Sequence, residues 1–353
     1  MRIEKRIQPS RGAFVWAPLS ALIFTLSISA LLVLWAGAPV GHTYVLLLQG
    51  AFGSVVALSE TLTRAIPLML TGLAAAVAFK ARLFNIGAEG QLYAGALAAV
   101  AVGGLHGGSG FAIAPSVLFV LMIVAAALAG ALMLLGPALL KSHLGVDEVV
   151  TTLLLNFIAL LFVSMMLDGP MKDPSAMGWP QSVALNSELE LSKLIPQTRV
   201  HSGLIGAFFL AIGLWVLMNF TVLGFDIRAV GASSRASAFA GVSISKTTLW
   251  VALLSGGLAG LAGAIEVAGR TSYVTLDMSP GYGYSGIVIA MLAGLHPLGV
   301  LAASLLVAGV MVGADSMSRA VGVPTFIADV IVATSLLSVM VASMLTQYRV
   351  RLR

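Results

Sequence analysis

The most unusual stretch of this sequence runs from Asn85 to Gln91, where Asn, Glu and Gln side chains occur within seven residues beside a long apolar run. An ionisable group inside an apolar segment is costly, so it usually faces a partner or a water-filled path. The two glycines of the stretch would allow a sharp turn or the close approach of another helix. Two interpretations stay open: Glu89 pairs with Arg82 or Lys80 and caps the following helix, or the break shapes a pathway for a solute.

A second polar segment, 224–247, contains the signals of a short helix. Ser233 is a suitable N-cap, and Gly241 is a suitable C-terminal stop, so the sequence predicts a helix between them. The side chains of Arg235 and Phe239 combine a charge with an apolar ring. This combination suits docking into a groove on another protein.

Several kinds of chemistry are disfavoured by the residue types. The run from Gly241 to Thr247 has the outline of a phosphate-binding loop, but Ser245 stands where such a loop needs the glycine before its lysine. An ATP-driven process would therefore need an ATPase on another chain. The histidines show no metal-ligand spacing, there is no cysteine, and no Ser/His/Asp or dicarboxylate arrangement favours an intramembrane enzyme. The net charge of +5 is not gathered into a stripe that would bind nucleic acid.

The acidic residues support an alternative function. Glu60, Glu266, Asp315 and Asp329 lie within or near apolar runs. Together with Glu89 they could carry protons or sodium ions in a secondary transporter. The simpler interpretation is that the last three of these acids end apolar segments at an interface.

The overall composition identifies the environment in which these groups must work. Of the 353 residues, 59% are hydrophobic and 9% are charged, and the mean hydropathy is +1.02. Soluble domains carry about a quarter charged residues, so this chain cannot cover a water-facing surface. Its apolar runs are continuous rather than alternating, which disfavours a membrane β-barrel. The sequence therefore predicts an all-α polytopic membrane protein.

Ten apolar segments approach the length of about 20 residues that a helix needs to cross a bilayer. Two of them are short and follow Gly-rich polar breaks, so eight spans with two re-entrant segments are an alternative to ten. We expect one transmembrane domain over 1–353. The ten segments are 14–36, 55–79, 91–105, 112–140, 148–167, 203–223, 248–268, 284–295, 297–316 and 324–346.

The positions of Lys and Arg predict the orientation of the chain, because basic loops tend to stay in the cytoplasm. With an even number of spans, the N-terminal tail 1–13 and the C-terminal tail 347–353 both lie in the cytoplasm. The loop 168–202 then lies outside, and 224–247 lies inside. The outer loop is either a solvated connector or a docking platform for an external partner.

The two halves of the chain have similar patterns. Segments 55–140 and 248–316 each run as a long helix, a glycine break, a short helix and a long helix. In the predicted threading, the first set begins outside and the second begins inside. This pattern is typical of an inverted repeat, in which broken helices meet at a site near the middle of the membrane.

Four stretches resemble, in the same order, motifs of the branched-chain amino acid/ribose/nucleoside class of ABC permeases. Leu83–Gln91 resembles the signature of this class, and Gly145–Ile158 resembles a stretch typical of its nucleoside and simple-sugar members. Ala229–Ser243 resembles its coupling loop, and Pro280–Ile287 resembles its second-half break. The resemblance covers about 55 to 345.

The resemblance implies a transport subunit rather than an enzyme, although Asp147 and Phe157 are mild departures where the class often has Asn and Tyr. This chain and a shorter paralogous permease would form the pathway in a bacterial plasma (inner) membrane. Cytoplasmic ATPases would bind ATP and Mg²⁺, an external solute-binding lipoprotein would deliver the solute, and this chain would bind no cofactor. The residues implied to contact the ATPase are Arg228, Gly231, Ser233, Arg235, Phe239 and Gly241.

The solute implied by the resemblance is a nucleoside, with a simple sugar of the ribose type as the alternative. Amide and hydroxyl groups would bind its hydroxyls, and aromatic faces would stack on its base. The binding protein usually sets selectivity in such importers, so the sequence leaves the exact solute open. The residues expected along the pathway are Phe84, Asn85, Glu89, Gln91, Thr152, Asn156, Tyr282 and Tyr284.

Overall fold

The computed structural model describes residues 2–5, 11–104, 114–322 and 324–351. These residues form two compact units, one built from both ends of the chain and the other from its middle. The predicted cytoplasmic tails and the first residues of the predicted span 112–140 lie partly outside the described residues. Each unit is considered by itself.

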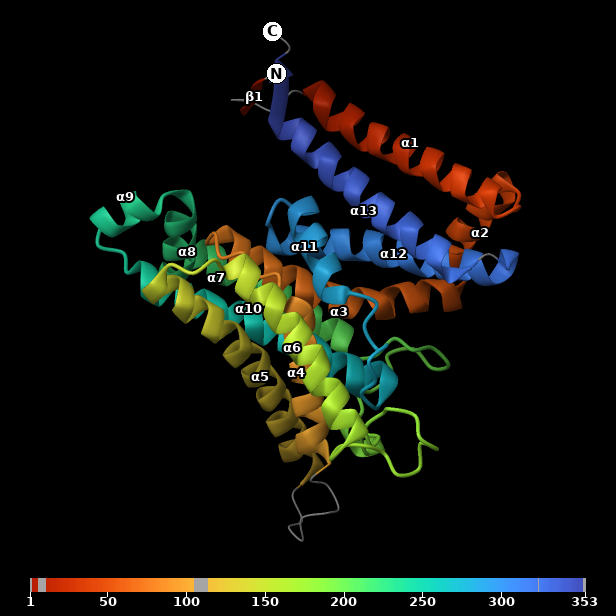
Figure 1. The fold of residues 1–353 in the computed structure, drawn as a ribbon, viewed down its shortest axis with the longest axis horizontal. Helices are drawn as coiled ribbons and strands as arrows, with labels where there is room; N and C mark the ends of the chain where they lie inside the picture. The colour runs from red at the N-terminus through yellow and green to blue at the C-terminus, as the bar shows by residue number, and fades with distance from the viewer. Residues whose placement is uncertain (1, 6–10, 105–113, 323, 352–353) are drawn as a thin grey trace. The chain divides into compact units, whose positions relative to one another are not determined.

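The first unit comprises Met1–Leu62 and Leu305–Arg353. In this unit α1 (Arg11–Trp35) runs beside α13 (Thr325–Gln347), as Figure 1 shows. The helix α2 (Val40–Phe52) follows α1 at an angle of 116°. The buried core of the unit contains Val33, Ala38, Ala314, Met317, Ala328 and Ile331.

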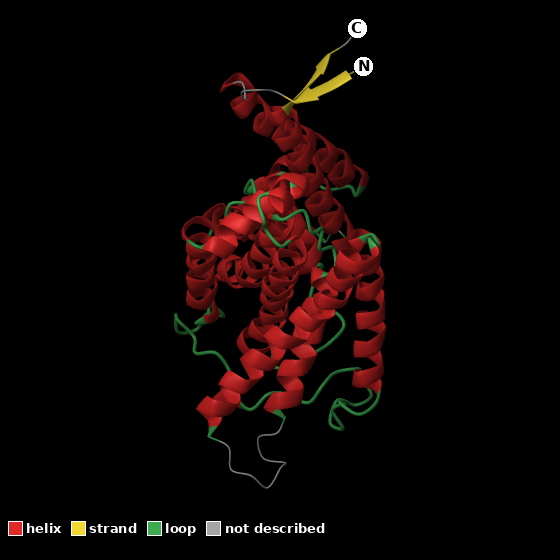
Figure 2. Ribbon diagram, turned by 90° about the vertical axis from the view of Figure 1, so that its left-hand side faces the viewer, coloured by secondary structure: helices red, strands yellow, loops and turns green. Residues whose placement is uncertain are grey.

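Two short strands occur near the ends of the chain. β1 (Arg2–Lys5) pairs antiparallel with β2 (Tyr348–Arg351), and Ile3 lies opposite Val350. Figure 2 shows both termini at this two-stranded ribbon. The elements of the described residues are otherwise helical, and these two segments of four residues each are too short to form a stable helix alone. Pairing between the two segments satisfies their backbone hydrogen-bonding groups instead.

The second unit comprises Thr63–Ser304 and contains the candidate site. Its centre is α10 (Ile244–Glu266), which packs against α4 (Ala88–Gly103) and α5 (Pro115–Leu144). The helix α4 also packs on α6 (Glu148–Asp168). These helices lie together in Figure 1.

Glycines allow backbone contact where α10 crosses its neighbours. A Cβ atom on Gly95 would lie 2.1 Å from the carbonyl oxygen of Gly260, and one on Gly130 would lie 2.2 Å from that of Gly256. Both distances are far shorter than van der Waals contact, so no larger residue fits there without moving a helix. Small residues at a crossing let membrane helices approach closely.

Both halves of the chain show the predicted order of long helix, break, short helix and long helix. The helix α3 (Val55–Lys80) precedes the first break and α4 follows it. The helix α10 continues into a π-helix, η2 (Val267–Thr271), before the second break. The helices α11 (Tyr282–Leu292) and α12 (Pro297–Val321) come after that break. The inverted relation between the halves stays a prediction.

The prediction of about ten crossing helices is too high for the described residues. Six of their helices are long and apolar enough to cross a membrane, or seven if the bent pair of α1 and α2 forms one span. The helices α4 and α11, with 16 and 11 residues, fall short of the about 20 that a span needs. The two segments predicted to be short are therefore short, and α2 is a helix that the sequence analysis did not predict.

Three further helices and one turn complete the second unit. The helix α7 (Gly203–Phe220) follows the loop 168–202, which contains a single 3₁₀ turn, η1 (Ser187–Leu189). The helices α8 (Val222–Ala232) and α9 (Ser234–Phe239) form the segment between α7 and α10.

Candidate functional site

The first break is held in place by the side chain of Asn85, which is fully buried. Its Nδ2 donates to Oε1 of Gln91 at 2.9 Å and to Oγ of Ser255 at 3.0 Å. Its Oδ1 accepts from Nε2 of Gln91 at 2.9 Å and from the backbone N–H of Gly87 at 2.9 Å. An amide side chain offers two donors and two main acceptor positions, so the hydrogen-bonding capacity of Asn85 is used within the protein.

Asn156, on α6, joins the same break to the second half of the chain. Its Oδ1 accepts from the backbone N–H of Gly90 at 2.8 Å. Its Nδ2 donates to the carbonyl oxygen of Ile86 at 2.8 Å and to the hydroxyl of Tyr284 at 3.2 Å. This one buried side chain therefore connects α6, the start of α4 and the start of α11.

The cytoplasmic end of α6, in the predicted orientation, also holds the break. The hydroxyl of Thr152 accepts from the backbone N–H of Ile86 at 3.2 Å and donates to the carbonyl oxygen of Glu148 at 2.6 Å. Oε1 of Glu148 accepts from the backbone N–H of Phe84 at 3.2 Å. Side chains in the first turns of α6 thus accept hydrogen bonds from the backbone N–H groups of Phe84 and Ile86, which lie after the end of α3.

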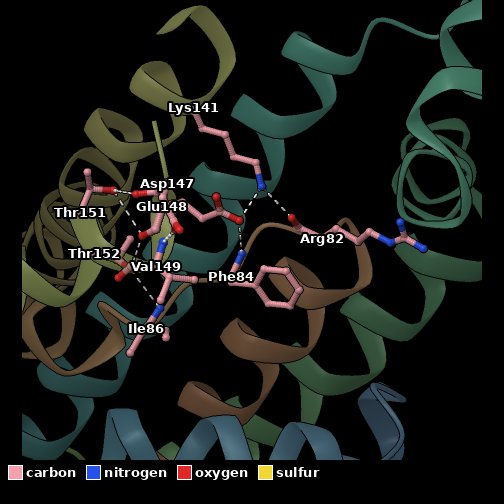
Figure 3. A network of polar contacts seen from close by, with 9 residues as sticks. All are labelled: Arg82, Phe84, Ile86, Lys141, Asp147, Glu148, Val149, Thr151 and Thr152. Atoms are coloured by element: carbon pink, nitrogen blue, oxygen red, sulfur yellow. Dashed lines mark hydrogen bonds and ion pairs between the residues drawn. The ribbon is translucent and has the colours of Figure 1, made fainter. Parts of the chain in front are cut away.

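An ion pair lies beside these contacts. Nζ of Lys141, near the end of α5, is 2.5 Å from Oε1 of Glu148 and donates to the carbonyl oxygen of Arg82 at 2.8 Å. Figure 3 shows Lys141 reaching both oxygen atoms, whereas the guanidinium of Arg82 points away from the pair. The carboxylate is mostly buried, with 9% of the side chain exposed, so this pair is screened less than a surface ion pair.

Glu89 does not pair with Arg82 or Lys80, and it does not cap α4. Its Oε2 accepts from the backbone N–H of Gly283 at 2.6 Å, and the N-cap of α4 is Gly87, with no side-chain cap. The reason is that the first turn of α4 packs directly on the first turn of α11. A Cβ atom on Gly283 would lie only 2.2 Å from the backbone nitrogen of Glu89.

The second break contains a buried ion pair that the sequence analysis missed. NH1 of Arg270 is 2.7 Å from Oε1 of Glu266 and donates to the hydroxyl of Tyr282 at 3.1 Å. Glu266 is fully buried and is the last residue of α10, so it is a paired acid rather than a lone one. The i,i+4 spacing of Glu266 and Arg270 was the available signal. The pair stands where α10 changes to a π-helix, a distortion that often occurs at functional sites.

Tyr93 is a second residue that the sequence analysis missed. Its ring is buried, and its hydroxyl donates to the carbonyl oxygen of Leu276 and accepts from the backbone N–H of Ser279 at 3.3 Å. The hydroxyl of Thr71 donates to the carbonyl oxygen of Tyr282 at 2.9 Å. Side chains of α3 and α4 therefore fix the irregular segment that leads into α11.

The structure brings most of the predicted pathway residues to the two breaks. Phe84 and Tyr284 are partly open, with 43% and 40% of their surface exposed. The other six are buried, and the polar contacts described above join them to protein atoms rather than to an open space. Their role along a pathway stays a prediction. The six buried residues are Asn85, Glu89, Gln91, Thr152, Asn156 and Tyr282.

The predicted short helix of the 224–247 segment is confirmed as α9. The hydroxyl of Ser233 accepts from the backbone N–H of Ala236 at 3.3 Å, as an N-cap does. Gly241 follows the helix with φ +85°, a conformation that favours glycine. Arg235 is exposed, and 97% of Phe239 is exposed, so both side chains are accessible in this chain.

The segment before α9 touches the first break. NH2 of Arg82 donates to the carbonyl oxygen of Ala232 at 3.3 Å. A Cβ atom on Gly231 would lie 1.8 Å from the carbonyl oxygen of Lys80, so only glycine allows this approach. Arg228 lies on α8, and its NH1 atom is buried with no hydrogen-bond partner among the described residues.

The loop 168–202 is hydrogen-bonded to the segment that precedes the second break. The backbone N–H groups of Ser182, Leu185 and Leu191 donate to carbonyl oxygens of Val274, Ser272 and Ala268 at 3.0, 2.7 and 2.8 Å. Oε1 of Glu190 accepts from the hydroxyl of Ser272 at 2.6 Å. These contacts make the loop more than a solvated connector, because it braces part of the second break.

The sequence matches one protein family over most of its length. The family is described as "Branched-chain amino acid transport system / permease component", and its model matches residues 57–345. The match includes both breaks and the segment with α8 and α9.

Three curated relatives illustrate this similarity. The chain is 36% identical to the guanosine ABC transporter permease protein NupP of Bacillus subtilis, with 93% of this chain and 94% of that protein covered. It is 33% identical to the glucose ABC transporter permease protein TsgB13 of Haloferax volcanii, with 99% and 94% covered. A second guanosine ABC transporter permease protein of Bacillus subtilis, NupQ, is 28% identical, with 69% of this chain and 77% of that protein covered.

Proposed function

Because this chain belongs to the family of branched-chain amino acid transport system permease components, we propose that it lines the pathway of an ATP-driven importer of nucleosides. The chain is a multi-pass permease subunit of an ABC transporter and is not itself an ATPase. The nucleoside proposal depends on one observation, the similarity to a guanosine permease protein across almost the whole of both chains. The ion-coupled secondary transporter is set aside, because the family is that of ABC permeases.

A simple sugar is the second candidate solute. The glucose permease protein TsgB13 is nearly as similar to this chain as the guanosine permease protein is. The polar side chains of the site do not separate the two solutes, because Asn85 and Asn156 are buried and bonded to protein atoms. The partly exposed rings of Phe84 and Tyr284 favour a solute with a flat base.

The importer needs three kinds of partner. An ATPase would dock on α9, where Arg235 and Phe239 are exposed. A paralogous permease would complete the pathway, in line with the two guanosine permease proteins of one organism that both match this chain. An external binding protein would deliver the solute to the outer loop. ATP and Mg²⁺ would be held by the ATPase.

The proposed location is a bacterial plasma membrane with both ends of the chain in the cytoplasm. Pairing of β1 with β2 supports this orientation, because paired strands must lie on the same side of the membrane. The basic residues in these end segments favour the cytoplasmic side.

The test uses the whole complex in liposomes with its ATPase, paralogous permease and binding protein. Uptake of radiolabelled guanosine is measured with and without ATP, and with excess unlabelled ribose or glucose as competitor. ATP-dependent uptake that neither sugar suppresses is the expected result. Uptake suppressed by a sugar would transfer the assignment to simple sugars, and uptake that follows an ion gradient without ATP would overturn the proposal.

A further inference from the structure

The ion pair of Lys141 and Glu148 has a position that the proposed transport function leaves unexplained. Lys141 lies near the end of α5, and Glu148 is in the first turn of α6, so the pair closes the turn between two long helices. That turn is already fixed by local signals. Gly145 ends α5 with φ +67°, and Asp147 caps α6 by accepting from the backbone N–H of Val149 at 2.8 Å. The ion pair is therefore not needed to form the turn.

The atoms of the pair are directed instead to the loop that precedes α4. Nζ of Lys141 donates to the carbonyl oxygen of Arg82, and Oε1 of Glu148 accepts from the backbone N–H of Phe84. Figure 3 shows that the lysine and the glutamate reach this loop from two different helices. Removing either charge would break the ion pair and one of these two contacts to the loop.

The same loop is joined to the segment that carries α9. The guanidinium of Arg82 donates to the carbonyl oxygen of Ala232, where α8 ends. Gly231 allows the backbone of α8 to contact that of Lys80. Arg82 therefore makes both contacts. Its carbonyl oxygen accepts a hydrogen bond from Lys141, and its side chain donates one to the last residue of α8.

We propose that Lys141 and Glu148 are positioning residues that couple the α8–α9 segment to the first break. They hold the loop 82–86 in a fixed conformation. When an ATPase displaces α9, the first turn of α4 then moves with it, whereas an unsupported loop would only change its own conformation. The inference rests on the proposed function, because it needs an ATPase that acts on α9. A coupling free energy between two sites commonly corresponds to roughly 5- to 150-fold.

The first test measures solute transported per ATP hydrolysed, in the reconstituted complex with the solute that the wild type takes up. The variants Lys141→Met and Glu148→Gln are expected to keep ATP hydrolysis but to lower this ratio about five- to tenfold. The double variant Lys141→Glu with Glu148→Lys restores opposite charges but places a carboxylate at the carbonyl oxygen of Arg82 and an ammonium at the N–H of Phe84, so its ratio is expected to stay low. The matched control is Asp147→Asn, which removes a neighbouring acidic charge and keeps an N-cap, and its ratio should equal that of the wild type.

An unchanged ratio in both single variants would overturn the proposal. Full recovery of the ratio in the double variant would also overturn it, because the charge pair would then suffice without the two contacts to the loop. A parallel loss of complex yield, hydrolysis and uptake in the single variants would leave the pair a purely structural role.

A second measurement does not depend on any solute. The chain contains no cysteine, so Leu144→Cys and Ser234→Cys, both at exposed positions, can carry spin labels on the α5 end and on α9. In the complex with its ATPase, we expect a narrow distribution of distances between the labels, and a broad one after Lys141→Met. Equal distributions would overturn the coupling role, whereas failure of guanosine uptake alone would overturn only the choice of solute.

Discussion

The backbone N–H of Gly283 donates to the carboxylate of Glu89 across 194 positions of sequence, at 2.6 Å. The two residues stand in the first turns of α11 and α4, the helices that follow the two breaks. Free N–H groups at the start of a helix carry partial positive charge, which favours a nearby carboxylate. One acidic side chain therefore stabilises the beginning of the other short helix.

This contact predicts different effects for two substitutions of Glu89. Glu89→Leu removes the acceptor and leaves the N–H of Gly283 buried, which should lower the free energy of unfolding by about 1–3 kcal/mol. Glu89→Gln keeps an acceptor oxygen and should lower it less. Thermal unfolding of the purified protein in detergent measures both. Equal melting temperatures for wild type and Glu89→Leu would contradict the stabilising role, and normal assembly of Glu89→Gln with lost uptake would indicate a role in the pathway.

The crossing of α5 and α10 predicts that Gly260 tolerates no side chain. A Cβ atom on Gly260 would lie 2.2 Å from the carbonyl oxygen of Ala126, so Gly260→Ala should separate packed helices and cost about 1–3 kcal/mol. Gly136→Ala is the matched control, because no atom lies within 4 Å of a Cβ atom at that position. The control should be neutral or slightly stabilising in thermal unfolding. A stable Gly260→Ala protein would show that the two helices are not held by backbone contact.

The exposed face of α9 predicts a loss of function without a loss of folding. Arg235→Glu together with Phe239→Ala should leave insertion and melting temperature unchanged, because both side chains are exposed in this chain. ATP-dependent uptake should fall at least about tenfold if several interface contacts are lost. Co-purification of the ATPase provides the second readout. Unchanged uptake would place the ATPase contact elsewhere.

The buried imidazole of His201 predicts a dependence of stability on pH. Burial lowers the pKa of His201 to about 4, and its Nδ1 accepts from the backbone N–H of Gly203 at 3.2 Å. In the unfolded chain the group titrates near pH 6.5. Between about pH 6.5 and 4 the unfolded state therefore binds the extra proton, and stability falls as the pH falls through this window.

Thermal unfolding between pH 7 and pH 5 measures this dependence. His201→Gln keeps a neutral acceptor for Gly203 and should flatten the decrease, even if it is less stable at pH 7. His143→Gln, at an exposed histidine, should keep the slope of the wild type. If the melting temperature of His201→Gln fell with pH as steeply as that of the wild type, other groups would be responsible for the pH dependence.

Local signals account for what could be predicted. The break at Asn85–Gln91 and the helix after Ser233 were both predicted, because glycines and capping residues act within a few positions of the backbone that they shape. The described residues contain fewer helices of span length than predicted, because apolar composition does not distinguish a crossing helix from a short one packed inside the protein. The helix α2 was missed because its 13 residues are too few for a span and follow the preceding apolar run after only four residues.

The sequence by itself determined that this chain is a helical membrane protein with two interrupted helices and a short helix at its 224–247 segment. Those features depend on apolar runs and on residues that are neighbours in the chain. Only the tertiary structure decided that Glu89 meets Gly283, that Glu266 meets Arg270 inside the protein, and that Lys141 and Glu148 hold the loop before α4. A buried polar group must find a partner, but which partner it finds depends on how distant helices pack.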